Sequence, residues 1–360
     1  MTLRFPFDAN IAQASTIPAR LYVDPVYFEL ERDRIFARTW QLAARAEQLQ
    51  RTGDYVAVEV AGERLVLVRD GEALRGFHNI CLHRAGPVAE GCGRRQTLQC
   101  RYHGWTYDLT GGLLRAPEME GVERFSPEDM HLLPVQVSAW GPLVFVNLDL
   151  KAPPLAHYLE DIPERASRFD AGRMRYVMRK EYELACNWKV YVDNYLEGYH
   201  VPVVHPGLHK ELDYDQYRVE TFRYYSRQHA PVRPTRPGDA SRRYRPSSPE
   251  EEPQYYWLFP NVMLNVYYGQ MQTNVVEPLD HQRTRVIFDW YALEPPADPA
   301  IDPAWAGMVA FSDEIQDEDV QICEAVQRNL RSRVYDRGRY SAKRENGVHH
   351  FHALLHEFLT

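Results

Sequence analysis

The spacing of apolar residues along the chain changes several times and predicts where helices and strands lie. Between residues 18 and 40, apolar side chains recur at helical intervals up to Trp40. Asp24 is a residue type that caps helices, and Pro25 after it suits a first helical turn. We therefore expect an N-terminal helical segment that covers residues 1–40.

The period then shortens to two, which is typical of strands. Residues 55–60 and 64–68 alternate around the tight turn Ala61-Gly62, and they predict a hairpin. Short strand-like runs with turn residues between them continue to Leu148. We expect residues 41–150 to form a small all-β domain, followed by a linker at 151–154.

The rest of the chain, residues 151–360, mixes both patterns. A long helical stripe covers residues 312–332, and residues 231–253 are rich in proline and charge, which predicts a mobile surface loop. Strand-like runs are found at 176–184, 255–259, 263–268, 273–276 and 285–291. This pattern predicts an α+β domain in which long helices pack against an antiparallel sheet.

One stretch of this second domain, residues 187–209, combines an aromatic stripe with ionisable side chains. Asp193, Glu197 and His200 stand at i, i+4 and i+7, so a helix would place them on one face. Prolines 202 and 206 end the helical pattern, and His205 falls between them. Buried carboxylates and imidazoles need partners, either opposite charges or a metal ion. The stretch is therefore a candidate metal site.

Composition and charge exclude several classes of function. The chain has 360 residues and a net charge of −8, which argues for two domains and against nucleic acid as a partner. No apolar run is long enough for a membrane span, and the first residues lack the features of a signal peptide. Five cysteines, an odd number, do not suggest a disulfide framework. We expect a cytoplasmic protein without a membrane partner.

Two Cys-His pairs lie inside the predicted β domain. Cys81 and His83 form the first pair, and Cys100 and His103 form the second after an interval of sixteen residues. All four could bind one structural zinc ion in a tetrahedral site. Alternatively, two thiolates could bind one iron and two imidazoles the other iron of a Rieske [2Fe–2S] cluster.

The residues around these pairs resemble the Rieske signature, because Gly104-Trp105 follows the second pair. Across nearly its whole length the chain is similar to the large (alpha) subunits of Rieske non-haem iron oxygenases. The resemblance implies a [2Fe–2S] cluster on Cys81, His83, Cys100 and His103. It also implies a catalytic domain of the helix-grip type, which binds mononuclear Fe(II) through two histidines and one carboxylate.

The family pattern falls on residues 187–205, so the resemblance implies that His200 and His205 bind the iron. The carboxylate must come from the run Gln316-Asp317-Glu318-Asp319. Helical spacing places Asp319 in line with the buried stripe, Glu318 beside it and Asp317 away from it. The resemblance also favours Asp319, and Glu318 is the alternative ligand.

The resemblance gives further roles on the same stretch. Glu197 matches the carboxylate that links an iron histidine to a cluster histidine of the next subunit, which implies a homotrimer. Most family members have aspartate there, and glutamate is similar to the carnitine type. Asp193 is expected to support a ligand histidine from behind. The terminal histidines at 349–352 have no role in the family pattern and are assigned to packing or surface.

The implied reaction is O₂ activation with electrons from NAD(P)H. The chain has no flavin or nicotinamide motif, so the resemblance implies a separate flavin or iron–sulfur reductase. Residues 259–265 and 272–274 look similar to choline- and carnitine-type monooxygenases, so a small methylammonium substrate is expected. Aromatic ring dioxygenation is the alternative, and an electron carrier or a zinc-stabilised binding module is the other class. Candidate residues for the substrate pocket are Val190, Asn194, Met263, Asn265 and Tyr267.

Overall fold

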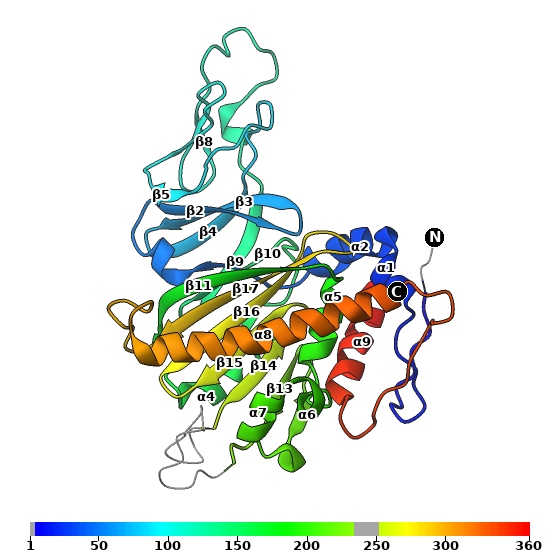
Figure 1. Cartoon of the computed structure of the whole chain (residues 1–360). Coiled ribbons are helices and arrows are strands. Elements are labelled where there is room, and N and C mark those ends of the chain that lie inside the picture. The colour runs from blue at the N-terminus through cyan, green and yellow to red at the C-terminus, as the bar shows by residue number, and fades with distance from the viewer. Residues whose placement is uncertain (1–3, 234–251) are drawn as a thin grey trace. The chain divides into compact units, whose positions relative to one another are not determined.

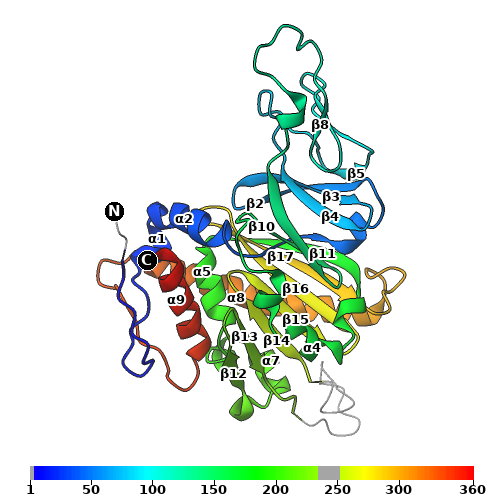
Figure 2. The ribbon, with the colours of Figure 1, turned by 180° about the vertical axis from the view of Figure 1, so that it is seen from behind.

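A computed structural model describes residues 4–233 and 252–360 of the chain (Figures 1 and 2). These residues divide into two compact units, one at 36–157 and the other at 158–360 together with the described residues up to 35. Most of the predicted loop at 231–253, namely residues 234–251, lies outside the described residues. Among the described helices, none is long and apolar enough to cross a membrane.

The unit at 36–157 is an all-β domain, as the two-residue period predicts. Its main sheet is antiparallel, with the strand order β1-β10-β9-β4-β3-β2-β5, and a smaller sheet has the order β6-β7-β8. The strands are β1 (Gln41–Arg45), β2 (Asp54–Val60), β3 (Glu63–Asp70), β4 (Ala73–His78), β5 (Cys92–Arg94), β6 (Leu98–Gln99), β7 (Thr106–Tyr107), β8 (Leu113–Arg115), β9 (Pro134–Trp140) and β10 (Leu143–Asn147). Short 3₁₀ turns are η2 (Ala46–Leu49) and η3 (Pro127–Asp129).

The hairpin of β2 and β3 confirms the predicted turn. Val60 pairs with Glu63, and Ala61 and Gly62 between them have φ of 54° and 78°. Two central residues with positive φ are typical of the turns whose twist matches a β-hairpin. The loop that follows β4 carries Cys81 and His83, and the loop from β6 to β7 carries the second Cys-His pair.

The other unit has a seven-stranded antiparallel sheet with the order β11-β17-β16-β15-β14-β13-β12. The strands are β11 (Arg175–Leu184), β12 (Arg218–Thr221), β13 (Tyr225–His229), β14 (Gln254–Leu258), β15 (Val262–Tyr267), β16 (Gln270–Pro278) and β17 (Thr284–Ala292). The helices are α1 (Arg20–Val23), α2 (Pro25–Glu31), α4 (Ile162–Ser167), α5 (Trp188–Tyr195), α6 (Val201–Val204), α7 (Pro206–Glu211), α8 (Pro303–Asn329) and α9 (Asn346–Leu359), and α3 (Leu155–Leu159) bridges the division between the two units. Single turns are η1 (Arg32–Phe36), η4 (Ala171–Arg173) and η5 (Tyr214–Gln216).

The long helix α8 runs across one face of this sheet (Figures 1 and 2). It starts nine residues before the predicted position because Asp302 caps it: the Asp302 carboxylate accepts hydrogen bonds from the backbone N–H groups of Ala304 and Trp305, each at 3.0 Å. Pro303 then occupies the first helical position. An antiparallel sheet covered by long helices confirms the predicted α+β class.

Two predicted helices differ from the structure. The N-terminal segment is broken, because Asp24 is extended and Pro25 begins a new helix, α2, after α1. The helix expected from residue 187 ends at Tyr195 instead of continuing to Pro202. Asp193, Glu197 and His200 therefore do not share one helical face, and the prediction of a common stripe is wrong. Sequence patterns also gave no sign of β12, β13 or α9.

Candidate metal centres and substrate cavity

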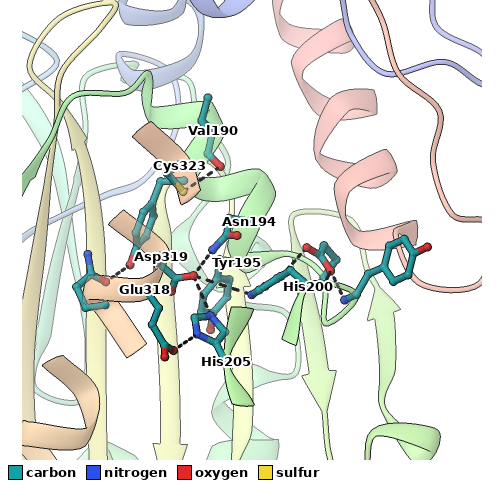
Figure 3. A network of polar contacts seen from close by, with 12 residues as sticks. Val190, Asn194, Tyr195, His200, His205, Glu318, Asp319 and Cys323 are labelled. Carbon is teal, nitrogen blue, oxygen red and sulfur yellow. Dashed lines mark hydrogen bonds and ion pairs between the residues drawn. The ribbon is translucent and has the colours of Figure 1, made fainter. Parts of the chain in front are cut away.

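His200 lies just before α6, His205 between α6 and α7, and Asp319 within α8, and the three side chains come together (Figure 3). One donor atom from each residue lies within 4.8 Å of the other two. Oδ1 of Asp319 is 3.0 Å from Nε2 of His205 and 4.0 Å from Nε2 of His200. The structure thus brings together the three residues that the sequence proposed as metal ligands.

Each of the two histidines has a second carboxylate on its other ring nitrogen. Oε1 of Glu197 lies 2.6 Å from Nδ1 of His200, and Oε2 of Glu318 lies 2.6 Å from Nδ1 of His205. A carboxylate on Nδ1 favours the tautomer with its proton there and leaves Nε2 with a free lone pair. Glu318, the alternative third ligand of the sequence analysis, is thus placed behind His205.

The backbone between α5 and α6 explains how His200 is held. Gly198 is needed there, since a Cβ atom would lie 2.6 Å from the ring of Tyr217. The carboxylate of Glu197, the residue before Gly198, accepts hydrogen bonds from the backbone N–H groups of Tyr199 and His200. Glu197 therefore fixes both the backbone and the imidazole of His200.

Helices α5 and α8 are joined by direct hydrogen bonds beside the three ligands. Nδ2 of Asn194 donates to Oδ1 of Asp319 at 2.6 Å (Figure 3). The Tyr191 hydroxyl donates to Oε1 of Gln316 at 2.6 Å. The sequence predicts Asn194 only as a residue of the substrate pocket. Its bond to Asp319 orients the carboxylate that faces the two histidines.

Burial and charge act in opposite directions on His205. Burial lowers the pKa of the imidazole, but the hydrogen bonds and negative charges of Asp319 and Glu318 outweigh it and raise the pKa above its usual value. The same surplus of negative charge would stabilise a divalent cation in place of the proton.

Asp193 does not support either of these histidines, so that prediction is corrected. Its carboxylate contacts Nε2 of His352 at 2.9 Å and accepts a hydrogen bond of 2.6 Å from the Tyr22 hydroxyl. His352 is fully buried, and its Nδ1 lies 2.7 Å from the Tyr340 hydroxyl. Asp193 therefore faces α9, whereas the ligand histidines lie beyond the end of α5 at Tyr195.

A cavity of about 890 Å³ adjoins the three ligands. Residues of strands β13 to β17 and of helices α5 to α8 line it. Of the predicted pocket residues, Asn194, Asn265 and Tyr267 line this cavity, whereas Val190 and Met263 do not. Val190 borders a separate cavity of about 210 Å³ on the side of Asp193, and Met263 is fully buried in the sheet.

The four cluster residues lie on two neighbouring loops of the β domain. Cys81 and Cys100 are buried, while the ring of His103 is exposed and lies 4.6 Å from that of His83 between centroids. A short backbone bridge shapes each loop: the Cys81 N–H donates to the Gly86 carbonyl, and the Cys100 N–H donates to the Trp105 carbonyl. Two thiols thus lie inside and two imidazoles toward the surface.

Nearby side chains fix the two thiols. The Tyr107 hydroxyl lies 3.4 Å from Sγ of Cys81 and accepts a hydrogen bond from the Leu82 N–H at 3.0 Å. A Cβ atom on Gly86 would lie 2.8 Å from Sγ of Cys100, so only glycine fits there. The donor set, two buried thiols and two outer imidazoles, fits a cluster with cysteines on one iron and histidines on the other.

The donor set of His200, His205 and Asp319 fits a different metal. Two imidazole nitrogens and one carboxylate oxygen gathered on one side of a cavity are typical of non-haem Fe(II) that keeps open positions for O₂. The residues present therefore fit a mononuclear iron next to the space where a small molecule can bind.

Two family models match the chain. The Rieske [2Fe-2S] domain model matches residues 39–126, and the model of the ring hydroxylating alpha subunit (catalytic domain) matches residues 171–360.

Full-length relatives agree with these matches. The chain is 36% identical to choline monooxygenase of Arabidopsis thaliana, over 98% of this chain and 85% of that protein. It is 31% identical to the carnitine monooxygenase oxygenase subunit of Escherichia coli (strain K12), over 97% of this chain and 95% of that protein. A crystal structure of the quaternary ammonium Rieske monooxygenase CntA matches with a TM-score of 0.87 and 28% identity over the whole of both chains.

A more distant neighbour shows how far the fold extends. Naphthalene 1,2-dioxygenase from Rhodococcus sp. matches with a TM-score of 0.78, at 20% identity, over 96% of this chain and 94% of that one. At this identity the match concerns the fold alone.

Proposed function

The chain belongs to the family of Rieske ring-hydroxylating alpha subunits, and on this premise we propose that it oxidises a small quaternary ammonium compound. With the [2Fe–2S] cluster and iron bound, such an oxygenase activates O₂ with electrons that a separate reductase takes from NAD(P)H. Hydroxylation of a C–H bond consumes O₂, two electrons and two protons, and yields C–OH and water. If the new hydroxyl stands on an N-methyl carbon, loss of formaldehyde completes a demethylation.

Within this proposal His200, His205 and Asp319 hold the iron, and Cys81, His83, Cys100 and His103 hold the cluster. The support for the first set is the approach of its donor atoms within 4.8 Å, with Glu197 and Glu318 behind the two imidazoles. The support for the second is the burial of both thiols with both imidazoles toward the surface.

The side chains that line the large cavity are the observation from which we infer the substrate class. Its described lining contains the carboxylates of Glu197, Glu211 and Asp319 but neither lysine nor arginine. Aromatic side chains cover much of the rest: Tyr191, Tyr195, Tyr217, Tyr255, Tyr267, Tyr268, Phe288, Trp290 and Phe311. Aromatic faces and carboxylates both attract a quaternary ammonium ion, which has no N–H group and needs no hydrogen bond.

Two of these rings form a corner suited to such an ion. The rings of Tyr255 and Tyr267 are perpendicular, at 88°, with centroids 6.0 Å apart. A trimethylammonium group placed between them would contact a ring face on one side and a second ring on the other. A neutral aromatic substrate, the second candidate, would gain nothing from the three carboxylates.

We further propose that the protein is a cytoplasmic homotrimer in which electrons pass from the cluster of one subunit to the iron of the next. What supports the electron path is the position of Glu197: it contacts His200 on one side and borders both cavities.

The test is O₂ uptake by the purified oxygenase with a partner reductase and NADH, with choline, glycine betaine, carnitine and benzoate as candidate substrates. We expect uptake and a hydroxylated or demethylated product with at least one ammonium compound. Product from benzoate alone would support aromatic hydroxylation instead.

Iron analysis separates the oxygenase from the other classes of function. About three irons per chain would support the oxygenase, and about two, without the mononuclear iron, would support an electron carrier. A colourless protein would indicate a zinc site in place of the cluster.

A further inference from the structure

One wall of the large cavity is a row of amide side chains. Asn265 of β15 and Gln270, Gln272 and Asn274 of β16 all line it. Strand residues two apart share a face, and Asn265 pairs directly with Gln272, so these four side chains lie on the same face of the sheet. A sheet face covered by helices is ordinarily apolar. Four amides on such a face call for a reason other than packing.

Hydrogen bonds fix the orientation of the central amides. The Tyr195 hydroxyl donates to Oδ1 of Asn265 at 2.7 Å, and Nδ2 of Asn265 donates to Oε1 of Gln272 at 3.2 Å. Nε2 of Gln272 then donates to the Ser312 hydroxyl at 3.1 Å. Burial raises the pKa of Tyr195, so its hydroxyl stays neutral and able to donate. The chain from α5 to α8 is therefore built entirely from uncharged groups.

Two further amides leave polar atoms without a partner. Oδ1 of Asn274 and Nε2 of Gln316 are buried, and neither has a hydrogen-bond partner among the described residues. Asn274 is 4% exposed and Gln316 is 1% exposed, and both residues line the cavity. A buried polar atom without a partner costs about 1–3 kcal/mol. A hydroxyl, which both donates and accepts, could satisfy an acceptor and a donor of this kind.

The charges around the amide row select against an anionic ligand. Of the three lining carboxylates, Asp319 is assigned to the iron and Glu197 contacts His200, so the Glu211 carboxylate is the one outside the iron site. The described lining has no lysine or arginine, so a ligand carboxylate at the amide row would find no ammonium or guanidinium partner there. A neutral hydroxyl needs no such partner.

From these observations we propose that three amides of the row, Asn265, Gln272 and Asn274, bind the uncharged polar end of the ammonium substrate and discriminate against substrates that end in a carboxylate. This rests on the proposed function, and it names the substrate class as a quaternary ammonium alcohol. The ammonium group occupies the Tyr255–Tyr267 corner, and the hydroxyl faces the amides.

Strand geometry places the two subsites at a suitable separation. Tyr267 pairs with Gln270, and Gln272 is two residues further along β16. Two residues of a strand span roughly 7 Å. A single small molecule with an ammonium group at one end and a hydroxyl at the other can bridge this span.

The test is calorimetric binding to the iron-loaded oxygenase without O₂, with choline, tetramethylammonium and glycine betaine as probes. Tetramethylammonium has the cation alone, and glycine betaine has a carboxylate in place of the hydroxyl. We expect choline to bind about tenfold more tightly than either of the other two, which corresponds to about one net hydrogen bond.

Variants show whether the amides cause the difference. Asn274→Leu and Gln272→Leu should each weaken choline binding about tenfold and leave tetramethylammonium binding unchanged. Thr273→Val is the matched control, because Thr273 lies between them in β16, is fully buried and does not line the cavity. Its choline affinity should equal that of the unmodified protein. Gln272→Lys should increase the affinity for glycine betaine.

The outcomes separate this inference from the proposed function. If glycine betaine or tetramethylammonium binds as tightly as choline, the role of the amide row is wrong while the ammonium site stands. If choline discrimination survives both leucine variants, the amides are not its source and the proposal fails. If none of the three probes binds, the proposed function fails and this inference fails with it.

Discussion

Glu318 holds His205 by the ring nitrogen that faces away from Asp319, with its Oε2 2.6 Å from Nδ1 (Figure 3). Glu318 and Asp319 are adjacent in α8, yet their carboxylates contact opposite nitrogens of one imidazole. Glu197 makes the equivalent contact with His200 at 2.6 Å. Each histidine is thereby held from behind with Nε2 directed toward the carboxylate of Asp319.

Replacing Glu318 should weaken iron binding without abolishing it. In Glu318→Gln the amide cannot stabilise the His205 tautomer as a carboxylate does, and loss of such a partner lowers metal affinity about 10–100-fold. Iron retention during titration with a chelator measures this. Asp317→Asn is the control, since Asp317 is exposed on the same helix. Equal retention by Glu318→Gln and the control would contradict the role of Glu318.

Replacing Asp319 should remove one metal and keep the other. We expect Asp319→Ala to contain about two irons per chain instead of about three, because the two histidines lose their carboxylate partner. The protein should stay brown and keep its Rieske EPR signal, since Cys81 and Cys100 belong to the other unit. Iron analysis combined with EPR checks both points. A full iron content in this variant would exclude Asp319 as a ligand.

Replacing Glu197 should separate metal content from turnover. Glu197→Gln keeps an acceptor oxygen for the N–H groups of Tyr199 and His200 but loses the negative charge beside His200. Because the amide holds His200 less firmly than the carboxylate, the protein is loaded with excess Fe(II) before the assay. We then expect about three irons per chain and a loss of product formed per NADH consumed. Near-normal product formation would show that Glu197 serves only to position His200, and the Asp317→Asn protein gives the reference rate.

A buried ion pair links α2 to α5. Nζ of Lys189 lies 2.6 Å from Oε1 of Glu31, Nε1 of Trp188 donates to Oε2 of Glu31 at 2.7 Å, and both charged side chains are fully buried. Lys189→Met leaves the Glu31 carboxylate without its cation, which should lower the free energy of unfolding by about 3–5 kcal/mol.

The double variant Glu31→Gln with Lys189→Met tests this explanation. It removes both charges and keeps an acceptor for Trp188, so it should recover much of the lost stability. Urea unfolding of both variants measures the difference. A double variant as unstable as Lys189→Met alone would show that packing, and not the unpaired charge, causes the loss.

His350 should make the protein less stable in mild acid. Burial lowers the pKa of His350 to about 4 in the folded protein, whereas an unfolded chain has a value of about 6.5. The folded state therefore resists protonation: its stability is complete above pH 6.5 and falls as the pH decreases toward 4. At about 1.4 kcal/mol per pKa unit the loss reaches about 3 kcal/mol.

The variant His350→Phe isolates this contribution. The ring would remain next to Trp257, whose centroid lies 6.1 Å from that of His350, but it could not be protonated. Thermal melting between pH 7 and 4 should show a smaller loss of stability than the unmodified protein. His157→Gln, at an exposed position, should melt like the unmodified protein at each pH. Identical pH profiles for His350→Phe and the unmodified protein would contradict the prediction.

The sequence by itself determined the features that depend on neighbours along the chain. The spacing within each Cys-His pair, the Ala61-Gly62 turn and the Asp24-Pro25 helix start are local patterns, and the structure has all three elements. The buried stripe of one helix also singled out Asp319 from the other carboxylates near it. Such predictions succeed because backbone geometry repeats over a few residues.

Only the tertiary structure decided which distant side chains meet. Asp319 reaches His205 across 114 positions, and Asp193 faces His352, 159 positions away. Helix α5 directs Tyr191 and Asn194 toward α8 and Asp193 toward α9. The cavity wall of Asn265 and Gln272 likewise depends on the register of β15 and β16. Strand register and helix packing depend on how side chains fit together throughout the core, so the spacing of residues within one segment does not predict them.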